Sequence, residues 1–143
     1  MGEVVDDFLE IVVKLFLGGS SGGYISLDAR GLTVASGRYE ITPEQLAKYR
    51  AKVAAERSGA PLSAIVAKLE NAGYTRSGEE LKRVPAGLPQ DHPRASLLRH
   101  KRLYIYKNFG LKPWLGSSAA RKYVAKVWTD AKPLNDWLTK HLD

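Results

Sequence analysis

The chain has 143 residues, of which 44% are hydrophobic and 26% charged, and its formal net charge is +7. These values are ordinary for a globular protein, and the length fits one domain but not two independent cores. The chain contains no cysteine, which excludes disulfides, thiolate catalysis and cysteine-ligated zinc or iron–sulfur sites.

The N-terminal segment, residues 1–17, has charged residues at helical spacing and apolar residues at most other positions. This pattern predicts an amphipathic helix whose wide apolar face must be covered, although its β-branched residues leave a strand as an alternative. Residues 18–23 read Gly-Gly-Ser-Ser-Gly-Gly, which is typical of a flexible linker. The tethered helix can dock on its own chain or on a neighbouring copy, and the second arrangement would be a homodimer.

The start of the chain does not resemble a targeting signal. It is acidic where secretory and mitochondrial signals are basic, and no apolar run approaches the roughly 20 residues that span a bilayer. Absence of cysteine also suits a reducing compartment. We therefore expect a soluble cytoplasmic protein that does not contact membranes.

Residues 24–143 are predicted to form one α+β domain, a small antiparallel sheet with helices packed mainly on one face. The domain opens with strands at 24–27 and 32–36. Gly31 lies in the turn between them, where it can adopt a positive φ. These features predict a β-hairpin at the start of the domain.

Two helices are predicted after the hairpin. The first begins at Thr42, which opens a Thr-x-x-Gln capping box, and it is expected to end at Ser58-Gly59. The second is expected to begin at Pro61, because proline suits the first turn of a helix, and to end at Gly73.

The next segment predicts strands and one helix start. A strand at 74–76 is expected to pair with one at 81–84, and a helix is expected to begin within 91–93. Strict alternation then predicts a strand at 102–106.

The C-terminal region predicts two consecutive helices. The first begins at Ser117 or Ser118, and Pro133 is expected to break it because proline removes a backbone donor. Trp128 and Trp137 lie on the inward faces of these helices, so both are expected in the core.

The stretch from Lys82 to Lys107 concentrates basic charge, with seven basic residues against one acidic residue, a net of +6. Within its strand, arginine and tyrosine side chains share one face. Such a surface suits single-stranded nucleic acid or another anion, because rings stack on bases and cations contact phosphates. The alternative is that the tyrosines pack under a helix while the charges stay solvated. The candidate residues are Arg99, Lys101, Arg102, Tyr104 and Tyr106.

Asp91 and His92 are the candidate catalytic residues, because they precede a predicted helix start where an anion could bind. The same Asp-His-Pro sequence is equally a capping arrangement. His100 and His141 lack ligand spacing, so neither a metal site nor a bound cofactor is expected.

Several segments together resemble the C-terminal part of a bacterial family of uncharacterised proteins, the domain of unknown function 2461. Their order and spacing make the match specific across most of the chain. The segments are Gly23–Leu27, Gly37–Tyr39, Pro43–Arg50, Glu80–Gly87, Asp91–Pro93, Leu97–Lys101 and Lys132–Leu138.

The chain departs from this family at its start. The family's arginine-rich motif, R-x-x-R-D-x-R-F followed by a lysine and a tyrosine, is missing. The resemblance therefore implies a truncated or engineered member, or a natural short variant, and it transfers no activity.

From the sequence we expect a structural or interaction module with no intact active site, not an enzyme. The first alternative is binding of single-stranded nucleic acid or an anion through residues 82–107. The second is an enzyme with a site near Asp91 and His92.

Overall fold

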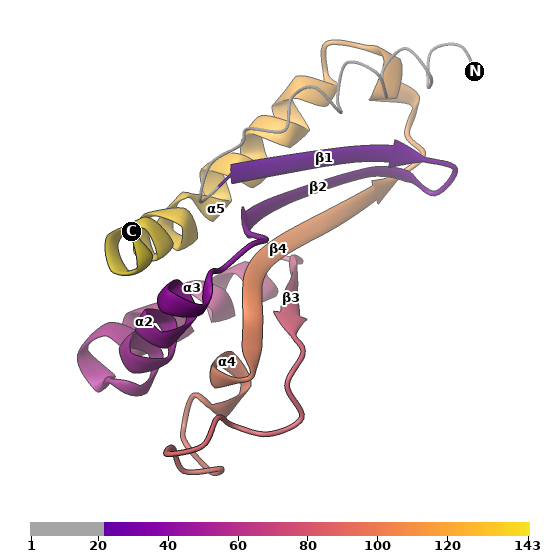
Figure 1. Cartoon of the computed structure of the whole chain (residues 1–143). Helices are drawn as coiled ribbons and strands as arrows, with labels where there is room; N and C mark the ends of the chain where they lie inside the picture. The colour runs from indigo at the N-terminus through magenta and orange to yellow at the C-terminus, as the bar shows by residue number, and fades with distance from the viewer. Residues whose placement is uncertain (1–21) are drawn as a thin grey trace.

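The computed structural model describes residues 22–143, which form a four-stranded antiparallel sheet in the order β1-β2-β4-β3 together with four α-helices (Figure 1). The α+β class with an antiparallel sheet is confirmed. The strands are β1 (Gly22–Asp28), β2 (Gly31–Arg38), β3 (Thr75–Glu79) and β4 (His100–Gly110). The helices are α2 (Pro43–Ala54), α3 (Glu56–Asn71), α4 (Ala95–Leu98), α5 (Ala120–Leu142) and the short 3₁₀ helix η1 (Pro113–Gly116).

The predicted helix over 1–17 and the homodimer that it would form lie outside the described residues. The predicted linker over 18–23 lies outside them as far as residue 21. Its last two residues, Gly22 and Gly23, are the first residues of β1 instead, where they pair with Gly37 and Ser36 of β2.

The predicted hairpin is confirmed as β1 and β2, which pair from Gly22↔Gly37 to Asp28↔Gly31. Gly31 has a φ of 111°, and a Cβ at this position would lie 2.0 Å from the backbone of Gly110. Glycine is therefore required there for its conformation and for the close approach of β4.

The Thr42 capping box is confirmed at the start of α2, where the Thr42 hydroxyl accepts from the backbone N–H of Gln45 and the Gln45 side-chain oxygen accepts from the backbone N–H of Thr42. The predicted boundary between the two helices is wrong. α2 ends at Ala54 and α3 begins at Glu56, so Ser58-Gly59 and Pro61 lie inside α3. Gly59 is buried and contacts the backbone of Val53, so close packing between the two helices sets this boundary, not the glycine signal.

Residues 81–84 do not form the predicted strand. β3 pairs with β4 instead, and the backbone of Val84 is bonded by a side chain: Gln90 accepts from its N–H at 3.0 Å and donates to its carbonyl at 2.8 Å. The helix expected from 91–93 is a single turn, α4, that begins at Ala95. The strand predicted at 102–106 is confirmed and is longer, because β4 pairs with both β2 and β3.

α5 runs through Pro133 without the predicted break. Ala131 and Leu134 on either side of the proline are fully buried, so packing against the core offsets the lost hydrogen bond. No helix between residues 22 and 143 combines the length and apolar character needed to cross a bilayer.

One core joins the sheet to the helices. α5 packs on β2, and buried residues of β1, β2 and β4 meet those of α2, α3 and α5. Trp137 is buried in this core and Trp128 packs against it, which confirms the expected place of both tryptophans. Burial alternates along β1, so the residues between the core positions face the opposite side of the sheet.

Candidate functional site

The face of the sheet opposite the core carries a hollow of ≈ 610 Å³. The register of the sheet aligns residues from β1, β2 and β4 in rows across this face, such as Tyr24↔Ala35↔Tyr106 and Ser26↔Thr33↔Asn108. None of the lining residues comes from α2 to α5. The hollow is lined by Tyr24, Ser26, Asp28, Arg30, Thr33, Ala35, Tyr39, Ser77, Tyr104, Tyr106 and Asn108.

Four tyrosines form a continuous aromatic cluster at one end of this hollow, and we call them the tyrosine face. Tyr39 lies between Tyr24 and Tyr104, with ring centroids 6.1 Å and 4.4 Å away, and Tyr104 lies 6.5 Å from Tyr106. Tyr24 is 42% exposed, and Tyr104 and Tyr106 are partly exposed. Burial raises the pKa of Tyr39 well above its usual range, so its hydroxyl stays neutral.

The other end of the hollow is polar. Asn108 donates to the Thr33 hydroxyl at 2.7 Å, and the Asp28 carboxylate accepts from the backbone N–H of Arg30 at 2.8 Å and from its guanidinium at 3.1 Å. The backbone hydrogen bond from Arg30, followed by its side chain, lowers the pKa of Asp28. The hollow therefore combines rings with hydroxyl and amide groups and one exposed ion pair.

The structure separates the five residues predicted to bind nucleic acid or an anion. Tyr104 and Tyr106 line the hollow, but the three basic residues do not. Arg99 pairs with Glu79 at 3.0 Å and Arg102 with Glu80 at 2.9 Å, while Lys101 is exposed. The β3–β4 register shifts between Ser77, which pairs with Tyr104, and Glu79, which pairs with His100. Lys101 and Arg102 therefore lie within the irregular segment and Arg99 lies beyond it.

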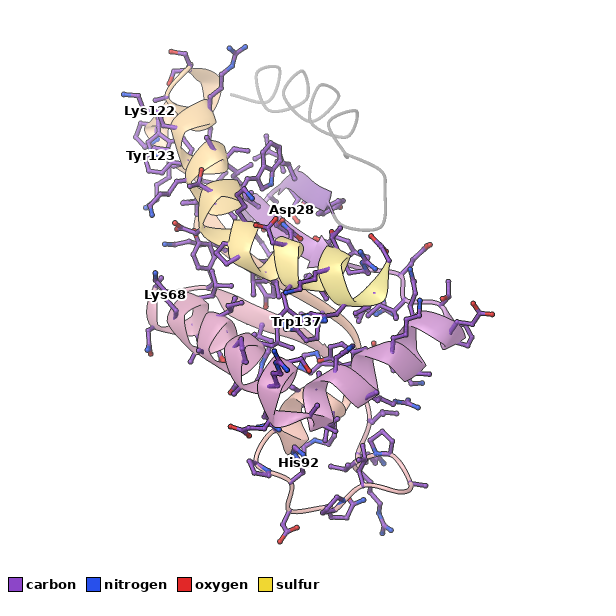
Figure 2. All side chains as sticks on the ribbon, turned by 90° about the vertical axis from the view of Figure 1, so that its left-hand side faces the viewer. Asp28, Lys68, His92, Lys122, Tyr123 and Trp137 are labelled. Atoms are coloured by element: carbon purple, nitrogen blue, oxygen red, sulfur yellow. The ribbon has the colours of Figure 1, made fainter. Side chains whose placement is uncertain are left out.

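His92 is held by two backbone groups but does not cap α4, whose N-cap residue is Arg94 with no side-chain capping bond. Its Nδ1 lies 3.0 Å from the backbone N–H of Arg94 and accepts from it, so Nε2 carries the proton and donates to the carbonyl of Ala54 at 3.2 Å. The residue lies at the loop end of the molecule beside the helices (Figure 2). Neither ring nitrogen is available for proton transfer in this arrangement, and Asp91 is exposed on the adjoining turn.

Arg94, which the sequence did not single out, fastens this loop to the α2–α3 junction. Its guanidinium donates to the carbonyls of Val53 at 2.6 Å and Ala54 at 2.9 Å, and to the carboxylate of Glu56 at 3.0 Å. The side chain is 8% exposed. The Asp91–Arg94 loop is therefore a structural brace.

His100 is fully buried, with Nδ1 donating to the carbonyl of Arg102 at 2.9 Å and no partner for Nε2 among the described residues. Burial lowers its pKa below the ordinary value of 6.5. As pH falls below about 6.5, the unfolded chain therefore takes up this proton before the folded one does, and stability is lost by at most about 1.4 kcal/mol per pH unit.

We expect His100→Asn to reduce this pH dependence, because asparagine keeps a donor near Nδ1 but does not titrate. Urea unfolding of both proteins at several pH values, from about 7.5 down to about 5, measures this pH dependence. Equal loss of stability in the two proteins would assign the acid sensitivity to other groups.

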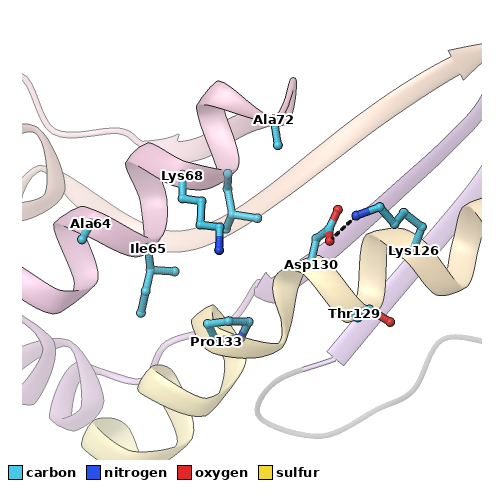
Figure 3. A pocket seen from close by; sticks show the side chains of 9 residues that line it. Ala64, Ile65, Lys68, Ala72, Lys126, Thr129, Asp130 and Pro133 are labelled. Carbon is cyan, nitrogen blue, oxygen red and sulfur yellow. Dashed lines mark hydrogen bonds and ion pairs between the residues drawn. The ribbon is translucent and has the colours of Figure 1, made fainter.

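A second hollow, of ≈ 480 Å³, lies between α3 and α5 (Figure 3). Ile65 and Pro133 face it, and Lys126 pairs with Asp130 at 2.7 Å along its edge. Asp130 also accepts from the Tyr74 hydroxyl at 2.7 Å. The hydrogen bonds from Lys126 and then Tyr74 lower the pKa of Asp130. Both oxygens of its carboxylate therefore already accept hydrogen bonds within the protein. Among residues 22–143, no three histidine or acidic side chains are grouped to hold a metal ion.

Sequence reasoning missed Tyr24 and Tyr39 as members of the tyrosine face. Tyr24 precedes the buried Ile25 in β1, and this alternation could have placed Tyr24 on the face opposite the core. That Tyr106 lies in the same row follows only from the pairing of β2 with β4. Tyr39 lies just beyond β2 and has no strand periodicity to place it.

The family model described as conserved hypothetical protein (DUF2461) matches residues 16–137, in agreement with the resemblance seen in the sequence. Neither the curated proteins nor the solved structures that were searched include a match to the chain.

Proposed function

Because this chain belongs to the DUF2461 family of conserved hypothetical proteins, a membership that carries no activity, we propose a function from its geometry: the tyrosine face binds single-stranded nucleic acid. The observation that carries the proposal is the ring cluster itself, in which Tyr104 lies 4.4 Å from Tyr39 and 6.5 Å from Tyr106 on a sheet face lined by no helix residue.

Unpaired bases offer the chemistry that this face accepts. Every base has a flat π-surface, and stacking on an aromatic side chain contributes about 1–3 kcal/mol per base without requiring a particular sequence. Ser77, Thr33 and Asn108 add hydroxyl and amide groups near the rings. These neutral donors and acceptors suit base edges and sugars. A duplex hides its base faces, so it fits this surface less well.

Phosphate contacts are expected from two arginines, because Arg30 lines the polar end of the hollow and Arg102 lies outside the lining, two residues before Tyr104 on β4. Arg30 is 86% exposed and pairs with Asp28, while Arg102 is 47% exposed and pairs with Glu80. Exposed ion pairs of this kind contribute about 0–1 kcal/mol, so either arginine can exchange its carboxylate for a phosphate at little cost. The proposal therefore expects few phosphate contacts and a modest dependence on salt.

Anisotropy titration of a labelled oligothymidylate tests this proposal. With two phosphates neutralised, log K should fall against log salt concentration with a slope of about −1.4, since single strands release roughly 0.7 counterion per contact. A duplex of the same length should bind more weakly. Absence of binding at low salt would refute the proposal, and a slope near −5 with equal duplex binding would indicate attraction to net charge alone.

A further inference from the structure

A third hollow, of ≈ 600 Å³, lies where α5 meets α2 and α3, away from the tyrosine face. It receives basic side chains from all three helices: Lys52 from α2, Arg57 from α3, and Lys140 with His141 from α5. We call this the basic hollow. Ala51, Ala55, Ser58, Pro61 and Trp137 complete its lining.

The positive charge of the basic hollow is not balanced by the described part of the protein. Lys52, Arg57 and Lys140 form no ion pair among residues 22–143, although many other charged residues there are paired. The carboxylates that neighbour these residues in sequence already have partners, because Glu56 pairs with Arg94, Asp136 with Lys132 and Asp143 with Arg38. Three like charges that converge on one concave surface favour an anion of more than one charge.

The aromatic wall of the hollow is fixed in place. The Trp137 Nε1–H donates to the carbonyl of Ser58 at 2.9 Å, and its ring meets Tyr49 edge-on at 6.1 Å. The His141 ring lies 4.6 Å from Trp137, and Figure 2 shows Trp137 between α5 and the neighbouring helices. Trp137 is 6% exposed, so it offers only a small apolar surface beside the cations, and its contacts hold that surface in place without rearrangement.

From this arrangement we infer that the basic hollow binds a phosphate monoester, with Lys52, Arg57 and Lys140 holding the phosphate and Trp137 contacting the organic group. A dianionic phosphate matches the unpaired charges, and charge-assisted hydrogen bonds to it are the strong ones. The hollow, at ≈ 600 Å³, is larger than a bare phosphate, which occupies about as much volume as a few water molecules of about 30 Å³ each. Room therefore remains for an organic group. The inference does not rest on the proposed nucleic-acid function.

His141 provides a reporter for the site. Burial, followed by the charges of Lys140 and Lys52, lowers its pKa. Arg57 is the remaining cation that lines the hollow, and no carboxylate lines it. A bound dianion would offset the lysine charges, so the pKa of His141 should rise when the site is filled.

The test follows the His141 ring signals by NMR while inorganic phosphate or phenyl phosphate is added to the full chain at constant ionic strength. We expect both ligands to raise the His141 pKa, and phenyl phosphate to bind more tightly because its ring contacts Trp137. Tighter binding of phenyl phosphate assigns an organic monoester, whereas equal binding reduces the site to bare phosphate and overturns the role of Trp137.

The double variant Lys52→Gln/Arg57→Gln should weaken phosphate binding by roughly tenfold, and Lys122→Gln, on the far end of α5, should leave it unchanged. All three side chains are exposed, so the variants are expected to fold, and circular dichroism checks this. Unchanged binding in the double variant, or no His141 response to either ligand in the original chain, would overturn the inference.

Discussion

Tyr104→Ala is expected to weaken binding of a labelled oligothymidylate by roughly 5- to 150-fold, which corresponds to the loss of about 1–3 kcal/mol of stacking. Tyr104 is central to the tyrosine face, since its ring contacts both Tyr39 and Tyr106. Removing it takes away one stacking surface and leaves its neighbours less constrained. Anisotropy titration at low salt measures the change.

Two matched variants control this result. Tyr104→Phe keeps the ring and should retain most of the affinity. Tyr123→Ala removes another partly exposed tyrosine, which stacks on Trp114 with ring centroids 4.0 Å apart and does not line the hollow, and should leave binding unchanged. If Tyr123→Ala weakens binding as much as Tyr104→Ala does, the tyrosine face is not the binding surface.

Arg94→Ala is expected to lower the free energy of unfolding by about 2–4 kcal/mol. The substitution leaves the carbonyl of Val53 without its donor, removes one of the two donors to the carbonyl of Ala54, and removes a side chain that is only 8% exposed. Each buried polar group that loses its partner costs about 1–3 kcal/mol. Urea unfolding followed by circular dichroism provides the measurement.

Glu56→Gln is the matched control for the ionic part of this brace. Glu56 is 82% exposed, so its pair with Arg94 should contribute only about 0–1 kcal/mol. The expected order is therefore a large effect for Arg94→Ala and a small one for Glu56→Gln. Equal effects would mean that the ion pair, not the bonds to the backbone carbonyls, holds the loop to α2.

Local chemistry made some elements predictable. The capping box at Thr42 and the turn at Gly31 are set by residues within four positions of each other, so their sequence pattern is sufficient to identify them. The alternation of Tyr104 and Tyr106 with buried neighbours likewise predicted that the two rings share a face.

Long-range packing decided the elements that were predicted wrongly. Pro133 remains inside α5 because residues on both sides of it are buried, and Gly59 lies inside α3 because α2 packs against it. The strand predicted at 81–84 lost its pairing partner to β4, which no local pattern reveals. Propensity is a weak prior that tertiary contacts override.

The candidate site was predictable only in part for the same reason. Tyr24 and Tyr106 are 82 positions apart in sequence and share a row only because Ala35 pairs with both. The glutamate partners of Arg99 and Arg102 come from β3 and the residue after it. Counting charges within residues 82–107 alone therefore overstated the unpaired positive charge there.

The tyrosine ring signals in a ¹³C–¹H NMR spectrum test the central claim most directly, because the seven tyrosines divide between two environments. Adding oligothymidylate should shift the four rings of the tyrosine face, Tyr24, Tyr39, Tyr104 and Tyr106, and leave Tyr49, Tyr74 and Tyr123 in place. Shifts confined to the second group, or no shifts at saturating oligonucleotide, would contradict binding at this face.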